Sequence, residues 1–234
     1  MKIAVFAIPE INLGKHNIKD ARLDQVYKIV KSKKETYIQI ELVGEDDILS
    51  ADAIIVLKDC RADLVLKDLE FIETRLSRTE SEEEKTILNK LKSILEKEEF
   101  IFSSALGEEE KRAISGYGLL TNKPVMPLDK EELADQDKLL ARVVKESGLV
   151  SFFITAGEKE TRAWLIKKGT TAWEAAGLIH SDIQRGFIRA EIISYADFIQ
   201  AGGETAAKQA GKMRLEQKEY LIQEGDLVNF RFSK

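Results

Sequence analysis

The sequence predicts an α/β unit followed by an α+β unit, each with a hydrophobic core of its own. Short apolar runs of strand length fill the N-terminal part, two long amphipathic patterns follow, and the last third alternates strand-like runs with turn signals. With 234 residues, 44% of them hydrophobic, the chain is long enough for two compact units.

The first unit begins with a predicted parallel sheet. Continuous apolar runs at Met1–Ile8, Tyr37–Val43 and Ala53–Leu57 are typical of strands that are buried on both faces. Between the first two runs, apolar residues follow the spacing of an amphipathic helix, at Leu23, Val26, Tyr27 and Val30. Asp20 is placed to cap this helix, and we expect the helix to cover that sheet.

A helical hairpin is predicted next, at about residues 63–100. Two apolar stripes with helical spacing comprise Val65, Leu69, Ile72 and Leu76, and then Ile87, Leu91, Ile94 and Leu95. Ser81 and Glu84 have the spacing of a capping box, so the turn lies near Arg78–Ser81. The many charged residues indicate a solvated face, with a partner-binding coiled coil as the alternative.

The rest of the first unit alternates helix and strand. Glu108–Ile114 reads as a helix, Pro124–Met126 as a strand, and Lys130–Gly148 as an acidic helical segment that ends on a glycine. We therefore place the boundary after this glycine, with a first unit over residues 1–148 and a second over residues 149–234.

The second unit has the element order of a β-grasp, or ubiquitin-like, fold. Strands are predicted at Val150–Thr155, Thr161–Lys167, Phe187–Ile193, Tyr220–Ile222 and Leu227–Phe232, a helix at Ala172–Ile179, and short helices around Phe198 and at Ala206–Gly211. A hairpin, a helix and then further strands of one mixed sheet define that plan.

Charge and cysteine content limit the function classes. The formal net charge of −5 excludes a protein that is basic over its whole surface. Residues 151–234 carry 12 basic and 11 acidic side chains, whereas residues 1–150 carry 24 and 30, so the C-terminal part is the one suited to approach a polyanion.

The single cysteine, Cys60, forms no internal disulfide and predicts a reducing cytoplasm. The first apolar run is too short to span a membrane.

Four segments of the second unit resemble the C-terminal TGS domain (DUF933-like) of the Obg-like ATPase (YchF) family. They are Thr155–Trp164, Gly177–Asp182, Arg185–Glu191 and Glu224–Phe232, in the order of the family. A weaker resemblance covers Asp20–Asp24 with Lys31–Lys34, Ser50–Val56, Glu108–Lys111 and Leu119–Pro124. The resemblance implies a shortened relative, with an eroded P-loop-type sheet ahead of a TGS domain.

The nucleotide-binding motifs of such a relative are changed. A P-loop reads Gly-x-x-x-x-Gly-Lys-Ser/Thr, because its glycines open the backbone to phosphates and its hydroxyl binds magnesium. Here Gly14 and Lys15 remain, but Pro9 and His16 replace the first glycine and the hydroxyl. Gly44–Asp47 contains no Asp-x-x-Gly switch, and Asn122 with Lys123 precedes a strand where a guanine-reading motif would follow one.

These changes predict a chain that is not an enzyme and has no catalytic residue, cofactor or metal. The leading hypothesis is a non-catalytic binding protein whose TGS domain associates with RNA or the ribosome. One alternative is a regulatory ATP or GTP binder without hydrolysis, with Gly14 and Lys15 as a residual nucleotide loop. The other is a protein-interaction platform built on the helical hairpin. No membrane partner is expected, and the oligomeric state is left open.

The predicted RNA- or partner-binding residues are Arg185, Arg189, Lys212, Arg214, Lys218 and Arg231. Arginine and lysine side chains bind phosphate oxygens without sequence preference, and surface-paired charges are the alternative for each residue taken singly. His180, at a predicted helix end beside Asp182, is predicted to cap the C-terminus of that helix, with a catalytic pair with Asp182 as the alternative. Trp164 is predicted to lie in the core, with base stacking as the alternative. For Trp173, core packing and base stacking both remain open.

Overall fold

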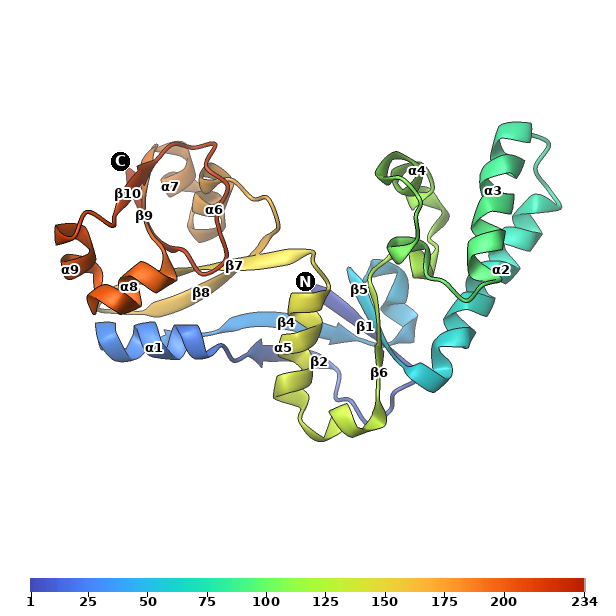
Figure 1. The fold of residues 1–234 in the computed structure, drawn as a ribbon, viewed down its shortest axis with the longest axis horizontal. Coiled ribbons are helices and arrows are strands. Elements are labelled where there is room, and N and C mark those ends of the chain that lie inside the picture. Colours follow the sequence, from blue (N-terminus) through green and yellow to red (C-terminus); the bar gives the residue numbers. More distant parts are fainter. Residues whose placement is uncertain (234) are drawn as a thin grey trace. The chain divides into compact units, whose positions relative to one another are not determined.

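The computed structural model describes residues 1–233 and divides into two compact units (Figure 1). The first comprises Met1–His16 and Ile40–Leu139, and the second comprises Asn17–Gln39 and Leu140–Lys234. The sequence prediction differs in two places, because it assigned both the segment Asn17–Gln39 and the residues just before 149 to the first unit. A family-domain boundary at residue 148 stays a prediction.

The first sheet has five strands in the order β2-β4-β1-β5-β6. Their bounds are Lys2–Phe6 (β1), Gly14–Ile18 (β2), Ile38–Val43 (β4), Ala53–Leu57 (β5) and Val125–Leu128 (β6). Strand β1 pairs in parallel with β4 and β5, and β5 pairs in parallel with β6. All five residues of β5 are buried, as expected of a strand covered on both faces.

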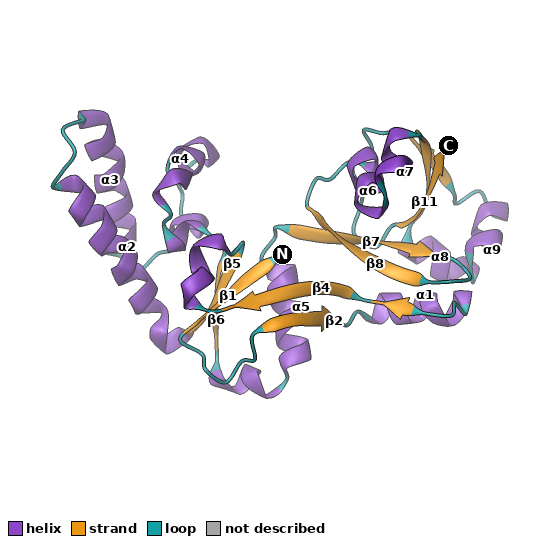
Figure 2. Ribbon diagram, turned by 180° about the vertical axis from the view of Figure 1, so that it is seen from behind, coloured by secondary structure: helices purple, strands orange, loops and turns teal. Residues whose placement is uncertain are grey.

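The predicted helical hairpin is present (Figure 2), and its apolar residues share one core with the segment 101–119. Helix α2 spans Arg61–Leu76 and α3 spans Glu82–Leu95. The hydroxyl of Ser81 accepts a hydrogen bond from the backbone N–H of Glu84 at 3.3 Å, so the predicted cap is confirmed. Residues of both apolar stripes, among them Ile72 and Leu91, are fully buried in this cluster.

A buried carboxylate fastens α2 to the segment that precedes β6. The Asp68 side chain accepts hydrogen bonds from the Leu120 N–H at 2.9 Å, the Thr121 N–H at 2.8 Å and the Thr121 hydroxyl at 2.7 Å. Burial raises the pKa of Asp68, although these three donors act to lower it. All three donors would lack a partner in this interior without the carboxylate.

The remaining elements of the first unit are short. They are the 3-10 segments at Glu45–Ser50 (η1), Lys58–Cys60, Ile101–Ser103, Ser115–Tyr117, Leu120–Asn122 and Lys130–Ala134, and helix α4 at Glu108–Ala113. The long helix predicted over Lys130–Gly148 is interrupted at Asp135, and helix α5 spans Gln136–Glu146. No helix among residues 1–233 is long and apolar enough to cross a membrane.

The second sheet has six strands in the order β10-β9-β11-β7-β8-β3. Their bounds are Glu35–Thr36 (β3), Val150–Ala156 (β7), Thr161–Lys167 (β8), Phe187–Ile193 (β9), Arg214–Glu216 (β10) and Leu227–Phe232 (β11). The helices are Ala172–Ile179 (α6), Ser181–Arg185 (α7), Tyr195–Ala201 (α8) and Glu204–Gln209 (α9). The predicted hairpin is β7–β8, and α6 follows it with the bounds that the sequence predicted.

Two details of this unit were predicted wrongly. Tyr220–Ile222 is not a strand, because this segment runs along the start of α6, where only Leu221 forms an isolated bridge with Thr171. Strands β3 and β10 and helix α7 were not predicted. All three are so short that they carry too little periodicity to be recognised from sequence.

Helix α1, at Ala21–Val30, packs on the second sheet and not on the first, so the expectation that it covers the N-terminal strands is wrong. Its buried residues are Leu23 and Val26, and Asp20 caps it as predicted. The segment that follows is held by the Ser32 hydroxyl, which donates to the Gly157 carbonyl at 2.5 Å, and by the pairing of β3 with β8. An amphipathic pattern specifies an apolar face but not the sheet that receives it.

Candidate functional site

The six predicted cations do not form one surface, but two of them are brought together on the second sheet. Arg189 of β9 and Arg231 of β11 are directly opposite in the antiparallel register, so their side chains lie on the same face. Among residues 1–233 no carboxylate forms an ion pair with Arg189, and its side chain is exposed. Two like charges at one cross-strand position repel each other, and an anion between them would relieve that repulsion.

Arg231 is also bound by the buried Glu191, which lies on the same face of the sheet. Its Nε donates to Glu191 Oε1 at 2.8 Å, a second guanidinium nitrogen contacts the same oxygen, and Asn229 Nδ2 donates to Oε2 at 2.8 Å. Burial alone would raise the pKa of Glu191, but the hydrogen bonds from Arg231 and Asn229 outweigh it and lower that pKa. Arg231 is therefore partly committed to the sheet, whereas Arg189 has no acidic partner among the residues that the structure describes.

Lys212 and Arg214 have partners within the fold. Lys212 Nζ lies 3.1 Å from an oxygen of Asp197. Arg214 donates to the Tyr220 hydroxyl at 3.0 Å and lies 3.7 Å from the buried Asp226, to which the Tyr220 hydroxyl donates at 2.8 Å. Burial and the bond to Asp226 raise the pKa of Tyr220 to about 12. Arg214 thus closes a network that holds the segment after β10.

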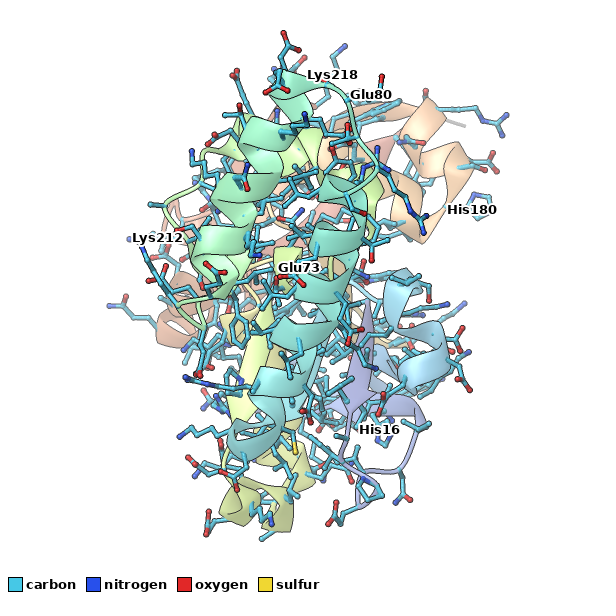
Figure 3. All side chains as sticks on the ribbon, turned by 90° about the vertical axis from the view of Figure 1, so that its right-hand side faces the viewer. His16, Glu73, Glu80, His180, Lys212 and Lys218 are labelled. Carbon is cyan, nitrogen blue, oxygen red and sulfur yellow. The ribbon has the colours of Figure 1, made fainter. Side chains whose placement is uncertain are left out.

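The two remaining cations lie elsewhere and are highly exposed. Arg185 forms an ion pair with Asp182 within α7, and Lys218 has Glu219 as its partner at 3.8 Å. In Figure 3 the labelled Lys212 and Lys218 lie at separate positions. The predicted set is therefore distributed over the domain, and its use by RNA stays a prediction.

His180 and the two tryptophans have distinct roles. His180 ends α6, and its Nδ1 accepts the Asp182 N–H at 3.0 Å, so its side chain caps the following helix α7. Trp164 packs against the core, stacks with Phe153 at 6.3 Å between ring centroids, and donates from Nε1 to the Thr155 hydroxyl at 2.9 Å. Its core assignment is confirmed. Trp173, in contrast, is 43% exposed.

The predicted residual nucleotide loop follows β1, and its two residues belong to the next strand. Gly14 and Lys15 begin β2, and the His16 ring bonds to the Asn12 carbonyl at 2.8 Å. The carboxyl ends of parallel strands are where open α/β sheets bind ligands. Among residues 1–233, Lys15 forms no ion pair and is exposed.

At this edge of the first sheet, the Glu45 carboxylate accepts a hydrogen bond from a backbone N–H. Ala7, directly after β1, has a φ of 53° and donates its N–H to Glu45 Oε1 at 3.1 Å. The other oxygen of Glu45 lies 3.4 Å from Lys67 Nζ, and this ammonium group lies 4.6 Å from the Phe6 ring centroid. A backbone N–H and an ammonium group that hold one carboxylate form an arrangement suited to an anion.

Sequence reasoning missed Glu45 and Lys67. The available signal was the acidic run after β4, because the carboxyl ends of neighbouring parallel strands meet at one edge of the sheet. Lys123, in contrast, is not part of a base pocket. Its Nζ donates to the carbonyls of Ile48, Leu49 and Ala51 at 2.9, 2.7 and 2.8 Å, and burial lowers its pKa.

The family model of the YchF GTPase C-terminal region, described as a protein of unknown function (DUF933), matches residues 149–233. The ribosome-binding ATPase YchF of Bacillus subtilis is 34% identical over 247 aligned positions, which cover 78% of this chain and 67% of that protein. The YchF protein of Buchnera aphidicola is 32% identical, with 93% of this chain and 74% of that protein covered.

The chain belongs to the YchF family. It spans about two thirds of the length of the Bacillus subtilis relative. The structure of the Schizosaccharomyces pombe YchF GTPase superposes with a TM-score of 0.77, covers 99% of this chain and 97% of that one, and shares 20% sequence identity. This likeness confirms the mixed α/β fold of a YchF protein with its TGS-like C-terminal domain.

The prediction that the chain is not an enzyme is contradicted. Relatives with 34 to 35% identity are named ribosome-binding ATPases, which points to a nucleotide hydrolase. Side-chain motifs alone do not define a phosphate site. Phosphates bind to backbone N–H groups and to lysines supplied by several elements, so a changed P-loop motif does not exclude hydrolysis.

Proposed function

We propose that this YchF-family protein binds the ribosome through the domain that contains residues 149–233, in the cytoplasm. The observation that carries the proposal is the 34% identity to a ribosome-binding ATPase over 78% of the chain. The match of the C-terminal family model to residues 149–233 supports the same conclusion.

The arginine pair on the second sheet is the phosphate contact we favour. Ribosomal RNA presents phosphates densely, and guanidinium groups bind phosphate oxygens in pairs. Within residues 1–233, Arg189 has no ion-pair partner, whereas Arg231 is held by Glu191 and Arg214 by Tyr220 and Asp226. Of the six predicted cations, Arg189 is therefore expected to contribute most to binding.

Co-sedimentation with purified ribosomes at increasing salt tests the proposal. The wild-type protein should pellet with ribosomes at 50 mM salt and be released progressively as salt rises, because phosphate contacts release counterions. Arg189→Glu should pellet less, and Arg78→Glu, an exposed arginine at the end of α2, is the matched control. A wild-type protein that never pellets would refute ribosome binding, and an Arg189→Glu variant that pellets normally would refute the assigned contact.

Nucleotide binding and hydrolysis form the second candidate activity, motivated by the ATPase relatives and by the anion-binding arrangement after β1. Mg-ATP or Mg-GTP should raise the Tm, because a ligand of the folded state stabilises it by mass action. A phosphate-release assay tests hydrolysis. No Tm shift and no phosphate release at millimolar nucleotide, with and without ribosomes, would reject this activity.

Glu45 offers a sharper version of that test. A nucleotide phosphate that binds the Ala7 N–H must first displace the Glu45 carboxylate. Glu45→Gln keeps the shape and removes the competing charge, so the variant should bind nucleotide more tightly than the wild type. The neighbouring Asp46→Gln is the control, since Asp46 is exposed on the same segment.

A further inference from the structure

One face of the second unit presents an aromatic ring that the core does not use. Trp173 lies in the first turn of α6, where the side chain is 43% exposed. Its neighbours on the helix, Ala172, Ala175 and Ala176, form the buried side of α6. Among residues 1–233 nothing accepts a hydrogen bond from the Trp173 indole, whereas the indole of Trp164 donates to Thr155.

The backbone around this ring is well fixed. Thr171 and Glu174 form a capping box, with the Glu174 N–H donating to the Thr171 hydroxyl at 3.3 Å and the Thr171 N–H donating to Glu174 Oε2 at 2.8 Å. The Trp173 N–H donates to the Lys218 carbonyl at 3.2 Å. The ring is therefore presented by a rigid turn of helix and not by a loose loop.

The segments that precede and flank the first turn of α6 carry exposed apolar and basic side chains. Leu221, in the segment beside the first turn of α6, is 50% exposed. Lys167, the last residue of β8, and Lys168, in the turn that leads into α6, are exposed and form no ion pair among residues 1–233. The Lys218 side chain is 66% exposed. The acidic groups of this region are Glu174, which serves the cap, and the exposed Glu219.

We propose that Trp173 is a stacking platform for an unpaired base of single-stranded RNA, with Lys168 and Lys218 on the adjacent phosphates. An exposed indole offers a flat surface on which any base can stack, and neighbouring lysines attract the backbone. The inference rests on the proposed ribosome binding, and it adds a second contact on the α6 side of the sheet. Arg189, in contrast, shares its face with Glu191 and Asn229, which turn away from α6.

A single-tryptophan variant gives a direct readout of stacking. In full-length Trp164→Phe, the fluorescence comes from Trp173 alone. Poly(U), whose bases stack poorly on one another, should quench this fluorescence, whereas inorganic polyphosphate should bind without quenching. If Trp164→Phe does not fold, wild-type protein labelled with 5-fluorotryptophan resolves the two rings by fluorine NMR, and the Trp173 resonance should shift with poly(U).

Affinity for poly(U) provides the second measurement. Trp173→Ala should weaken binding about tenfold or more, and Trp173→Phe should weaken it less, because an aromatic surface remains. Leu178→Ala is the matched control, since Leu178 is 52% exposed on the same helix. Lys218→Gln should lower the affinity and the salt dependence without abolishing the quenching.

Each outcome separates this inference from the proposed function. Wild type that pellets with ribosomes, but shows neither quenching by poly(U) nor an effect of Trp173→Ala, would overturn the stacking site and leave ribosome binding intact. Quenching by poly(U) without ribosome pelleting would support the site and reject the function. Ribosome binding that Trp173→Ala weakens equally at low and high salt, without poly(U) quenching, would assign the ring to a ribosomal protein and overturn the inference.

Discussion

Asp68 in the first unit and Glu191 in the second are both buried carboxylates, but they are satisfied in opposite ways. Asp68 accepts only from neutral groups of the interior, the Leu120 N–H, the Thr121 N–H and the Thr121 hydroxyl. Glu191 accepts from Arg231, whose side chain is 54% exposed. Accordingly, burial dominates at Asp68 and raises its pKa, while the guanidinium lowers the pKa of Glu191.

The difference shows where a ligand can influence each unit. Asp68 is buried and its donors belong to the interior, so a ligand on the surface does not compete for its hydrogen bonds. The Glu191 site extends from the core to the surface through one guanidinium group, so an anion that engages Arg231 competes with a buried carboxylate. Arg189, at the opposite cross-strand position, pairs with no carboxylate in the described part of the chain, so an anion that binds it displaces none of these groups.

The largest effect is expected for Asp68→Ala. This variant leaves two backbone N–H groups and one hydroxyl without an acceptor in the interior, which should cost about 3 kcal/mol or more of unfolding free energy. Urea denaturation measures the loss, and Asp63→Ala, an exposed aspartate in the first turn of α2, is the control. Equal midpoints for the two variants would show that the three hydrogen bonds contribute nothing net.

A smaller loss is expected for Arg231→Met. Methionine preserves much of the apolar stem, but Glu191 then keeps only Asn229 as a partner. The expected cost is about 2 kcal/mol, and the double variant Arg231→Met with Glu191→Met should recover part of it, because no buried charge remains. Failure of the double variant to recover stability would argue that the arginine acts through packing alone.

The two carboxylates should also respond to acid with opposite signs. The pKa of Glu191 lies below its ordinary value of 4.5 in the folded state, so its stabilisation is present above that pH and is lost as the pH falls through the folded pKa. The pKa of Asp68 lies above 3.8, so its protonation on acidification favours the folded state.

Denaturation midpoints between pH 7 and pH 3.5 check these signs. Relative to the wild type, Glu191→Gln should lose less stability on acidification and Asp68→Asn should lose more. Parallel profiles for the two variants would contradict the assignment.

The smallest effect is expected for Arg189→Ala. Removing one of two opposed arginines should leave the unfolding free energy unchanged or raise it by up to about 0.5 kcal/mol, because like charges across a strand pair repel. The same variant should bind ribosomes less well than the wild type, and thermal denaturation beside co-sedimentation measures both. A substantial loss of stability would mean that Arg189 is a structural residue.

The sequence predicted most strands of both sheets because their apolar runs and flanking turns are long enough to read. Strands β5, β8, β9 and β11 and helix α6 have the predicted bounds. The sheet on which α1 packs was not predictable, because hydrophobic periodicity shows which face of a helix is buried but not which element covers that face. The YchF resemblance was correct, whereas absent motifs were wrongly taken to exclude an enzyme.

Candidate site residues were harder to predict, for a physical reason. Whether an arginine is free depends on carboxylates that are distant in sequence, as Glu191 is from Arg231 and Asp226 from Arg214. The same holds for Glu45, which reaches the Ala7 N–H from a different strand end. Such pairings follow from register, and register was not specified by any motif.

The assignment of Asn17–Gln39 to the second unit has a consequence for synthesis of the chain. Helix α1 and strand β3 are made early, but β7 and β8, on which they pack, follow only after the whole first unit has been translated. The buried side chains of α1 must therefore remain without their final partners for most of translation, a period in which exposed apolar surface favours misassembly. For the same reason, a fragment limited to residues 149–233 would lack one edge strand and one covering helix of its own domain.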